Sequence, residues 1–224
     1  RMETLFPTCY DGTRWEAIFV KFEIKKLKAE EDERQEIYRL RYLVYTCELH
    51  QHGESEREVL TDELDAYNEY IGAYTSEDIL AGFISITPPG RRYSLDKYRD
   101  RTTKKWMYQN AYELRILTVR EEYRREGIAL RLMEEAAKYV EKCGGRYIIS
   151  IGREELMPYY EQLGYVDLQE VYRSGKLKFH LMFNEPERLR ARAACLYERK
   201  CLHRNTNEEI TARKGVESRK GDTA

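Results

Sequence analysis

The sequence predicts a single α/β domain in which one mixed sheet is covered by helices on both faces. Segments that alternate apolar and polar residues, as strands do, are interspersed with segments whose apolar residues recur at helical spacing. Between residues 112 and 151, a strand, a helix and a second strand follow one another closely, a pattern that favours parallel pairing of the two strands. With 42% hydrophobic and 35% charged residues, the composition is ordinary for a soluble globular protein.

Composition also narrows the possible functions. The formal net charge of −1 leaves no global basic field to attract nucleic acid, and no apolar run approaches the length of a membrane span. The five cysteines are scattered, without a CxxC pair or a secretory signal, which favours free thiols in the cytoplasm. His50 and His52 have no third ligand at a recognisable spacing, so no metal is expected. We expect a soluble enzyme or binding domain, as a monomer or homodimer.

The N-terminal half is predicted to contain three strands and one helix. Alternating apolar residues predict an opening strand, and an acidic stretch suits the first turn of a helix because acidic side chains favour the positive end of the helix dipole. Two apolar runs joined by a short polar turn predict a hairpin, which two prolines end. In order, we expect a strand at 15–27, a helix at 30–50, a charged loop or frayed helix at 54–68, strands at 69–74 and 79–87, and a long connection at 91–109 of the kind that often forms a lid or substrate loop.

The segment at 112–140 joins a strand to a helix through a basic loop. Leu114 and Ile116 continue the two-residue period of the strand, and helical spacing begins at Ile128. The first amides of such a helix lack backbone partners, point toward the loop and lie at the positive end of the dipole. Gly127 lets a bulky oxyanion approach the backbone closely. The segment therefore predicts a pyrophosphate site.

The rest of the chain predicts one further strand, a short helix, a strand pair and a terminal helix. Gly144 and Gly145 indicate a helix end, and Pro158 suits the first position of the short helix. The cationic residues after residue 190 are interpreted as a solvated helix surface. In order, we expect a strand at 146–151, a helix at 154–163, an antiparallel pair at 165–168 and 177–183, a helix at 186–203 and a disordered tail at 204–224, so that 1–185 is the domain.

Two motifs resemble the GNAT superfamily of N-acyltransferases. RREGIA, from Arg124 to Ala129, fits the Gln/Arg-x-x-Gly-x-Gly/Ala loop of that superfamily. PYYEQLGY, at 158–165, is similar to its Tyr-x-x-x-Gly-Phe helix-to-strand signature and lies at the expected place. The resemblance covers roughly 80–183 and implies the N-acyltransferase fold.

Other segments are similar to the autoinducer-synthase-like branch, which includes acyl-homoserine-lactone synthases and long-chain N-acyl amino acid synthases. These segments are RYLVY at 41–45, TDELDAYNEY at 61–70 and GFISITP at 82–88. The chain has Ser85 where the branch usually has Arg, and Arg115 and Ile116 where the branch has Ser then Arg. The resemblance implies an N-acyltransferase without specifying its acceptor.

The resemblance also implies a donor and residues that bind it. The donor is acetyl-CoA, a longer acyl-CoA or the acyl-phosphopantetheine of an acyl carrier protein, and the acceptor is a primary amine of a small molecule that attacks directly in a ternary complex. Backbone groups of Leu117, Thr118 and Val119 would pair with the pantetheine arm, and the Val119 N–H is a candidate oxyanion donor. The pyrophosphate would bind to the loop of Arg124, Arg125, Glu126, Gly127, Ile128 and Ala129.

Glu113 and Tyr160 are the candidate catalytic residues. Glu113 would be the general base, since a carboxylate on a mostly apolar strand tends to have a raised pKa; an outward-facing Glu paired with a cation is the alternative. Tyr160 matches the tyrosine that protonates the thiolate in this superfamily, with Tyr159 as the alternative occupant.

Arg41, Ser85 and Arg115 are the candidate substrate-binding residues. For Arg41, the alternative is an ordinary surface ion pair on its helix. Two other functions stay open at this point: a non-catalytic acyl-CoA-binding regulatory module and a protein-lysine acetyltransferase.

Overall fold

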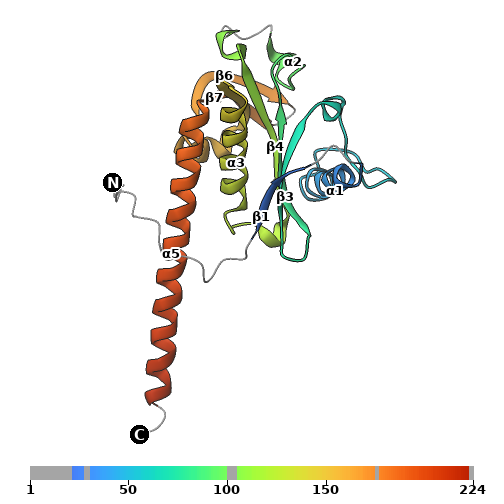
Figure 1. Ribbon diagram of the computed structural model, residues 1–224. Helices are drawn as coiled ribbons and strands as arrows, with labels where there is room; N and C mark the ends of the chain where they lie inside the picture. The colour runs from blue at the N-terminus through green and yellow to red at the C-terminus, as the bar shows by residue number, and fades with distance from the viewer. Residues whose placement is uncertain (1–21, 28–30, 100–104, 175–176, 222–224) are drawn as a thin grey trace.

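A seven-stranded mixed sheet, in the order β1-β2-β3-β4-β5-β7-β6, forms the centre of the molecule. The computed structural model describes residues 22–27, 31–99, 105–174 and 177–221. In Figure 1, α1 lies on one face of the sheet, and α3 and α5 lie on the other. The predicted fold class, a mixed sheet with helices on both faces, is confirmed. Among the described helices, none is long and apolar enough to cross a membrane.

The elements follow the predicted order. The strands are β1 (Glu23–Lys26), β2 (Glu69–Tyr74), β3 (Leu80–Thr87), β4 (Ala111–Val119), β5 (Tyr147–Arg153), β6 (Val166–Ser174) and β7 (Leu177–Asn184). The helices are α1 (Glu31–Tyr42), which continues as a π-helix (Leu43–Glu48), α2 (Asp96–Arg99), α3 (Ile128–Lys142), α4 (Met157–Gln162) and α5 (Pro186–Gly221). Short 3₁₀ turns occur at Glu63–Ala66, Lys105–Tyr108, Glu121–Tyr123 and Glu154–Leu156.

Of the opening strand predicted at 15–27, residues 15–21 lie outside the described residues, and Glu23–Lys26 form β1. Two other predicted boundaries need correction. β6 is longer than predicted, because its pairing with β7 continues to Ser174. The prediction of a disordered tail at 204–224 is wrong for 204–221, since α5 continues without a break to Gly221. This stretch contains no proline and is rich in Glu, Lys and Arg, which favour helix.

β4 and β5 pair over a short distance and then diverge. Their parallel ladder joins only Ala111–Glu113 to Tyr147–Ile149, as predicted in direction. A bulge bends β4 after this point, where the register with β3 shifts and Ile116 takes a φ of +52°. The Ser150 hydroxyl donates a 2.9 Å hydrogen bond to the Leu114 carbonyl at the point of divergence. Beyond this point β4 and β5 share no ladder in the described sheet, and we call the place where their edges diverge the opening between β4 and β5.

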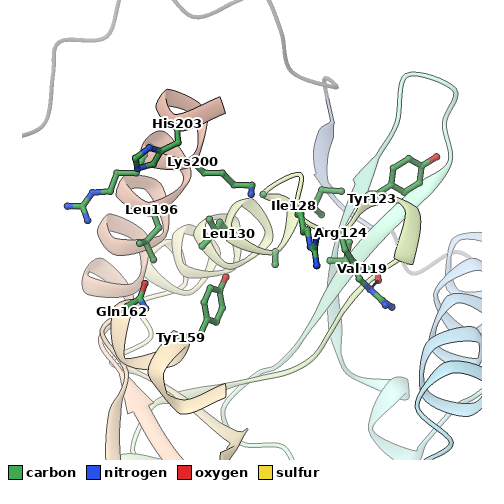
Figure 2. A pocket seen from close by; sticks show the side chains of 14 residues that line it. Val119, Tyr123, Arg124, Ile128, Leu130, Tyr159, Gln162, Leu196, Lys200 and His203 are labelled. Carbon is green, nitrogen blue, oxygen red and sulfur yellow. Dashed lines mark hydrogen bonds between the residues drawn. The ribbon is translucent and has the colours of Figure 1, made fainter. Parts of the chain in front are cut away.

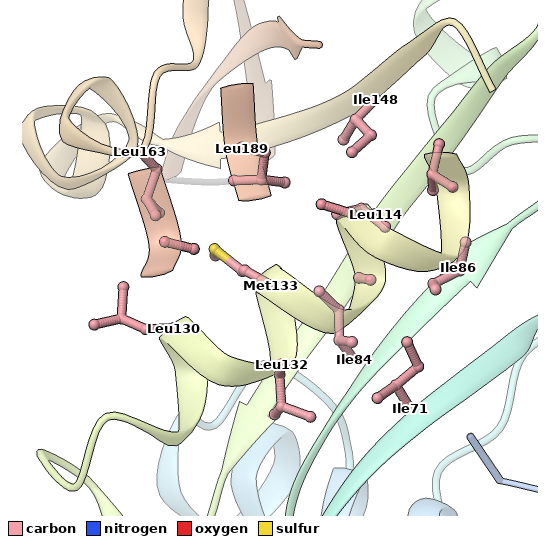
Figure 3. Close-up of a cluster of buried hydrophobic side chains, with 14 of the residues drawn as sticks. Ile71, Ile84, Ile86, Leu114, Leu130, Leu132, Met133, Ile148, Leu163 and Leu189 are labelled. Atoms are coloured by element: carbon pink, nitrogen blue, oxygen red, sulfur yellow. The ribbon is translucent and has the colours of Figure 1, made fainter. Parts of the chain in front are cut away.

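α3 packs its apolar face on the sheet and forms the centre of the largest core cluster (Figure 3). The predicted face is confirmed, because all five of its residues are buried; these are Ile128, Leu132, Met133, Ala136 and Val140. Gly144, with a φ of +71°, ends this helix as predicted. α5 adds Leu189 and Ala193 to the same cluster, and both are fully buried. This packing fixes the position of the loop before α3.

Candidate functional site

A pocket of about 460 Å³ lies at the N-terminus of α3 (Figure 2). Its volume lies within the range of small-molecule sites. Gly127 is the N-cap, with a φ of +85° that few other residues adopt, and it offers no side chain to the free amides of the first turn. The lining residues are Val119, Tyr123, Arg124, Arg125, Gly127, Ile128, Ala129, Leu130, Tyr159, Gln162, Leu196, Arg199, Lys200 and His203. The predicted loop thus forms one wall of a real cavity.

The charged side chains that line the pocket are all cationic at neutral pH. They are Arg124 and Arg125 from the loop and Arg199 and Lys200 from α5, with His203 beside them. Among the described residues that line the pocket, none is an Asp or Glu. Because the whole chain carries a net charge of only −1, this local excess is marked. Together with the amides of α3, it favours an anionic ligand.

The predicted loop residues do not all face the pocket. Arg124 donates through Nε to the Val119 carbonyl at 3.1 Å and pairs with Glu48 at the end of the π-helix, so it also ties the loop to β4. Glu126 is absent from the pocket lining and pairs instead with Arg204 of α5. Arg125 is exposed on the pocket rim, with a φ of +70°.

Of the three strand residues predicted to bind the donor arm, only Val119 lines the pocket. Leu117 packs on the main core cluster. Thr118 is buried and donates its hydroxyl to the Ile116 carbonyl at 3.2 Å. The Val119 N–H points toward the opening between β4 and β5, because Arg120 N–H bonds to Ala81 of β3 and successive amides of a strand alternate in direction.

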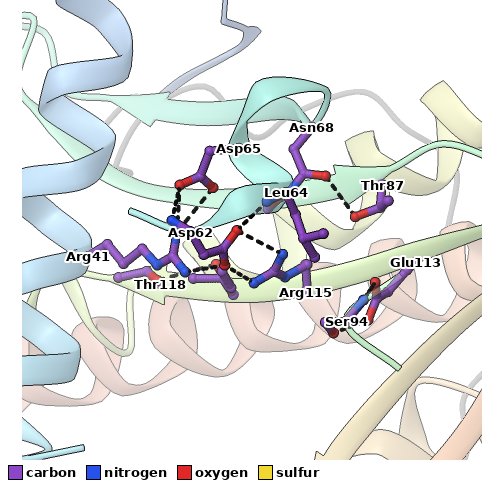
Figure 4. A network of polar contacts seen from close by, with 12 residues as sticks. Arg41, Asp62, Leu64, Asp65, Asn68, Thr87, Ser94, Glu113, Arg115 and Thr118 are labelled. Carbon is purple, nitrogen blue, oxygen red and sulfur yellow. Dashed lines mark hydrogen bonds and ion pairs between the residues drawn. The ribbon is translucent and has the colours of Figure 1, made fainter. Parts of the chain in front are cut away.

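An arginine–aspartate cluster, formed by Arg41, Asp62, Asp65 and Arg115, lies beside β4 on the face of α1 (Figure 4). Arg41 bonds to both oxygens of Asp65 at 3.1 and 3.2 Å and to Asp62 at 2.6 Å. Arg115 bonds to Asp62 as well. Burial acts to raise the pKa of Asp62, but hydrogen bonds and charge from Arg115 and Arg41 outweigh it and lower this pKa to about 2. Asp62 is therefore ionised at neutral pH.

Two of the three predicted substrate-binding residues share an ion-pair partner. Arg41 is 6% exposed, which rules out an ordinary surface ion pair, and Arg115 shares its partner Asp62. Ser85 lies directly opposite Arg115 in the β3–β4 ladder but joins none of these ion pairs; it is fully buried, and its hydroxyl accepts a 3.0 Å hydrogen bond from the Asn68 side-chain amide. The sequence analysis missed Asp62 and Asp65 as site residues. Their signal was two carboxylates three residues apart at a helical turn, where Asp62 caps the amide of Leu64.

Glu113 is buried on the same face of β4 as Arg115. One carboxylate oxygen accepts a 2.7 Å hydrogen bond from the Ser94 amide, and the other accepts from the Ser94 hydroxyl. Burial raises the pKa of Glu113, and the Ser94 hydrogen bonds and the charge of Arg115 offset only part of this effect. The raised pKa is as predicted, and the alternative of an outward-facing Glu is excluded.

The two adjacent tyrosines of α4 point to different places. Tyr159 lines the pocket, and burial raises its pKa to about 12. Tyr160 packs against Gly152 of β5, at the opening between β4 and β5, where a Cβ on Gly152 would lie 2.8 Å from the ring. Burial, with the nearby phenol of Tyr45, raises the pKa of Tyr160, and the Tyr45 hydroxyl bonds to Thr118. Both α4 phenols are therefore protonated at neutral pH.

Comparison with known proteins identifies the fold of this site. Residues 44–185 match the family model described as an acetyltransferase (GNAT) domain, and no curated protein matches the chain. The fold is similar to the CoA-dependent acyl-homoserine lactone synthase BjaI (TM-score 0.68, 15% identity, covering 80% of this chain and 90% of that one). It is also similar to the AHL synthase LasI (TM-score 0.60, 13% identity, covering 74% of this chain and 89% of that one). An acyl-CoA N-acyltransferase from Pseudomonas aeruginosa is a further structural neighbour (TM-score 0.57, 16% identity, covering 73% of this chain and 99% of that one).

Proposed function

The chain belongs to the acetyltransferase (GNAT) family and is an N-acyltransferase, and we propose that its donor is an acyl-CoA and that its acceptor is the primary amine of a small molecule bearing a carboxylate, such as an amino acid. One observation carries the proposal. The opening between β4 and β5 has a cationic pocket on the α3 side and the arginine–aspartate cluster with Glu113 on the α1 side. A donor and an acceptor can thus meet from opposite faces of one sheet.

The pocket fits the donor. Free amides at the first turn of α3, behind a side-chain-free Gly127, suit a diphosphate, and Arg125 adds a positive charge at the rim. Beyond Leu114, the edge of β4 that faces β5 has no ladder within the described sheet, so an amide-bearing arm can pair with Leu117–Val119 as an added strand. When bound, acyl-CoA supplies a thioester carbonyl as the electrophile.

The residues around the opening can complete the chemistry. Glu113 takes the proton from the acceptor ammonium, and its raised pKa suits this role. The Val119 N–H donates to the carbonyl oxygen as negative charge develops there. As the N–C bond forms and the C–S bond breaks, Tyr160 gives its hydroxyl proton to the departing sulfur. The nitrogen loses two protons in all: Glu113 holds the first, and the second returns to the Tyr160 phenolate, so no covalent acyl-enzyme is required.

The acceptor is argued from the charges near Glu113. Arg115 lies two residues along the same strand, with a side chain that is 12% exposed, and can bind a carboxylate while Glu113 binds the ammonium. Tyr67 interacts electrostatically with Arg115, Asp62 and Glu113 and therefore lies near the same site. Its hydroxyl donates a 2.9 Å hydrogen bond to the Arg92 carbonyl. A cation and a carboxylate two positions apart match a zwitterionic amine better than a hydrophobic one.

The test is thiol release and product mass with a panel of acyl-CoA donors and amines. The panel includes amino acids, S-adenosylmethionine (which is named with isopentyl-CoA in a BjaI structure), a lysine peptide and simple alkylamines. We expect amide product with a carboxylate-bearing amine, and a loss of about 10²–10⁴-fold in kcat for Glu113→Gln with unchanged donor binding. Donor binding without turnover on any amine would instead indicate a regulatory module. A preference for the lysine peptide would point to a protein acetyltransferase.

A further inference from the structure

We propose that α5, a helix outside the family domain at 44–185, recognises the nucleotide phosphates of CoA through Lys200 and His203. The inference rests on the proposed function and deepens it, because it selects a CoA thioester rather than a carrier-protein thioester as the donor. It is argued from how α5 is held, which face it turns to the pocket and which charges lie there.

α5 is held firmly against the N-terminal turn of α3. The Tyr197 ring covers Gly127 so closely that a Cβ on this glycine would lie 2.7 Å from Tyr197 Cε2. The guanidinium of Arg131, a residue of α3, lies 5.3 Å from the centre of the same ring and makes a cation–π contact with it. Glu126 of the loop pairs with Arg204, about two turns further along α5 than Tyr197. The helix is thus a fixed wall of the pocket.

The pocket-lining residues of α5 share one helical face. Leu196, Arg199, Lys200 and His203 are separated by the i, i+3, i+4 and i+7 spacing that places side chains in one stripe. Leu196 also packs on the main core cluster, so the stripe begins at the core and becomes cationic toward the pocket mouth. In Figure 2, the Lys200 side chain extends from α5 toward the first turn of α3.

Lys200 is available for a ligand. A Cβ on Gly127 would lie 3.5 Å from Lys200 Cδ, so the lysine stem crosses the loop that carries the free amides. Within the part of the chain that the structure describes, no ion pair within 4.0 Å engages Lys200, whereas Arg131, Arg190 and Arg204 are each paired with a Glu. Glu126, the loop residue next to Gly127, is paired with Arg204.

The number of cations favours the nucleotide. The amides of α3 and Arg125 suffice for the diphosphate, and the α5 stripe adds cations on the opposite wall. CoA carries a further phosphate on its ribose, whereas the arm of a carrier protein ends in a single phosphodiester attached to a protein. That protein would need open surface at the pocket mouth, where α5 contributes lining residues. A cationic helix in this position therefore suits CoA.

The test compares CoA with dephospho-CoA, which lacks the ribose phosphate, by calorimetry. For the unmodified chain we expect CoA to bind at least tenfold more tightly, because the ribose phosphate adds charge-assisted hydrogen bonds that dephospho-CoA cannot form. In the Lys200→Gln/His203→Gln variant, the preference should fall to about twofold. The control is Arg192→Gln, an exposed cation of the same helix outside the pocket lining, which should keep the full preference.

A donor assay separates this inference from the proposed function. The double variant should lose at least tenfold in kcat/KM with acyl-CoA and retain its rate with an acyl-pantetheine thioester, which lacks the nucleotide. If the double variant prefers CoA over dephospho-CoA as strongly as the unmodified chain does, and still acylates amines, the α5 assignment alone is overturned. If the unmodified chain binds neither CoA form, the proposed function fails as well. Unchanged thermal unfolding of the variants would show that the comparison is between folded proteins.

Discussion

Ser94 binds Glu113 through two groups at once, its amide at 2.7 Å to one carboxylate oxygen and its hydroxyl to the other. Both contacts favour the ionised carboxylate, while burial favours the neutral acid. A residue of the long connection at 91–109, which is predicted to form a lid or substrate loop, thus lowers the pKa of the proposed base against the larger effect of burial. Both hydrogen bonds come from Ser94, one from its backbone amide and one from its hydroxyl.

The Ser94→Ala variant tests this relationship by pH dependence. Loss of the hydroxyl removes a hydrogen bond that lowers the pKa of Glu113, so this pKa should rise further. A general base must be deprotonated, so activity falls below its pKa, and the acidic limb of the kcat/KM profile should move to higher pH. The measurement is the profile with one donor and one amine. At high pH, where Glu113 is deprotonated in both proteins, activity should be nearly unchanged. An acidic limb that stays at the same pH would show that Glu113 is not the base.

The tyrosine pair of α4 separates binding from protonation. Tyr160→Phe should lower kcat by about 10²–10⁴-fold at constant donor affinity, since its phenol lies at the opening between β4 and β5. The matched control, Tyr159→Phe, removes a hydroxyl from the pocket wall and should mainly change the KM for the donor. The measurement is steady-state kinetics of both variants. The reverse split would assign the acid role to Tyr159.

Gly152→Ala offers an independent check of the same position. A Cβ on Gly152 would lie 2.8 Å from the Tyr160 ring, so the ring must move while its hydroxyl remains present. We expect kcat to fall by about tenfold or more, because small displacements of a reacting group are costly. A variant with normal stability and normal kcat would show that Tyr160 does not need its observed position.

The arginine–aspartate cluster should make stability depend on acid. The pKa of Asp62 is lowered to about 2 from an ordinary value of 3.8, so its ionised form stabilises the fold above about pH 4, and this contribution is lost as the pH falls toward 2. With a side chain that is 29% exposed, the contribution is about 1–2 kcal/mol after solvent screening. Asp62→Asn should therefore be destabilised at pH 7 by this amount, with a smaller difference at pH 2.

Urea unfolding of Asp62→Asn at several pH values measures this effect. Asp78→Asn is the matched control, because its carboxylate is 82% exposed in a 3.6 Å pair with Lys25 and should contribute little. An Asp62→Asn difference that stays constant from pH 7 to pH 2 would contradict the ionic origin of the stabilisation.

The sequence predicted those elements whose residue spacing alone specifies a strand, a loop or a helix. The strand, the Gly127 loop and the amphipathic α3 are each specified by spacing within a few residues, and the structure places them as expected. The divergence of β4 from β5 had no such signal, because the bulge at Ile116 depends on how β4 pairs with β3. Spacing alone does not reveal where a parallel ladder stops.

The residues missed by the sequence analysis depend on contacts between distant segments. Asp62 and Asp65 resemble any charged turn until Arg41 and Arg115, from two other elements, meet them. Lys200 has the same helical spacing whether its face is solvated or lines a pocket. Only the packing of Tyr197 on Gly127 decides which, and that contact joins residues 70 positions apart.

The most direct test of the account is the initial-velocity pattern with acyl-CoA and the best amine varied together. Direct attack across the opening requires both substrates to be bound at once, so double-reciprocal plots should give intersecting lines, with one thiol released per amide formed. Parallel lines would indicate a covalent acyl-enzyme and would contradict the proposed roles of Glu113 and Tyr160.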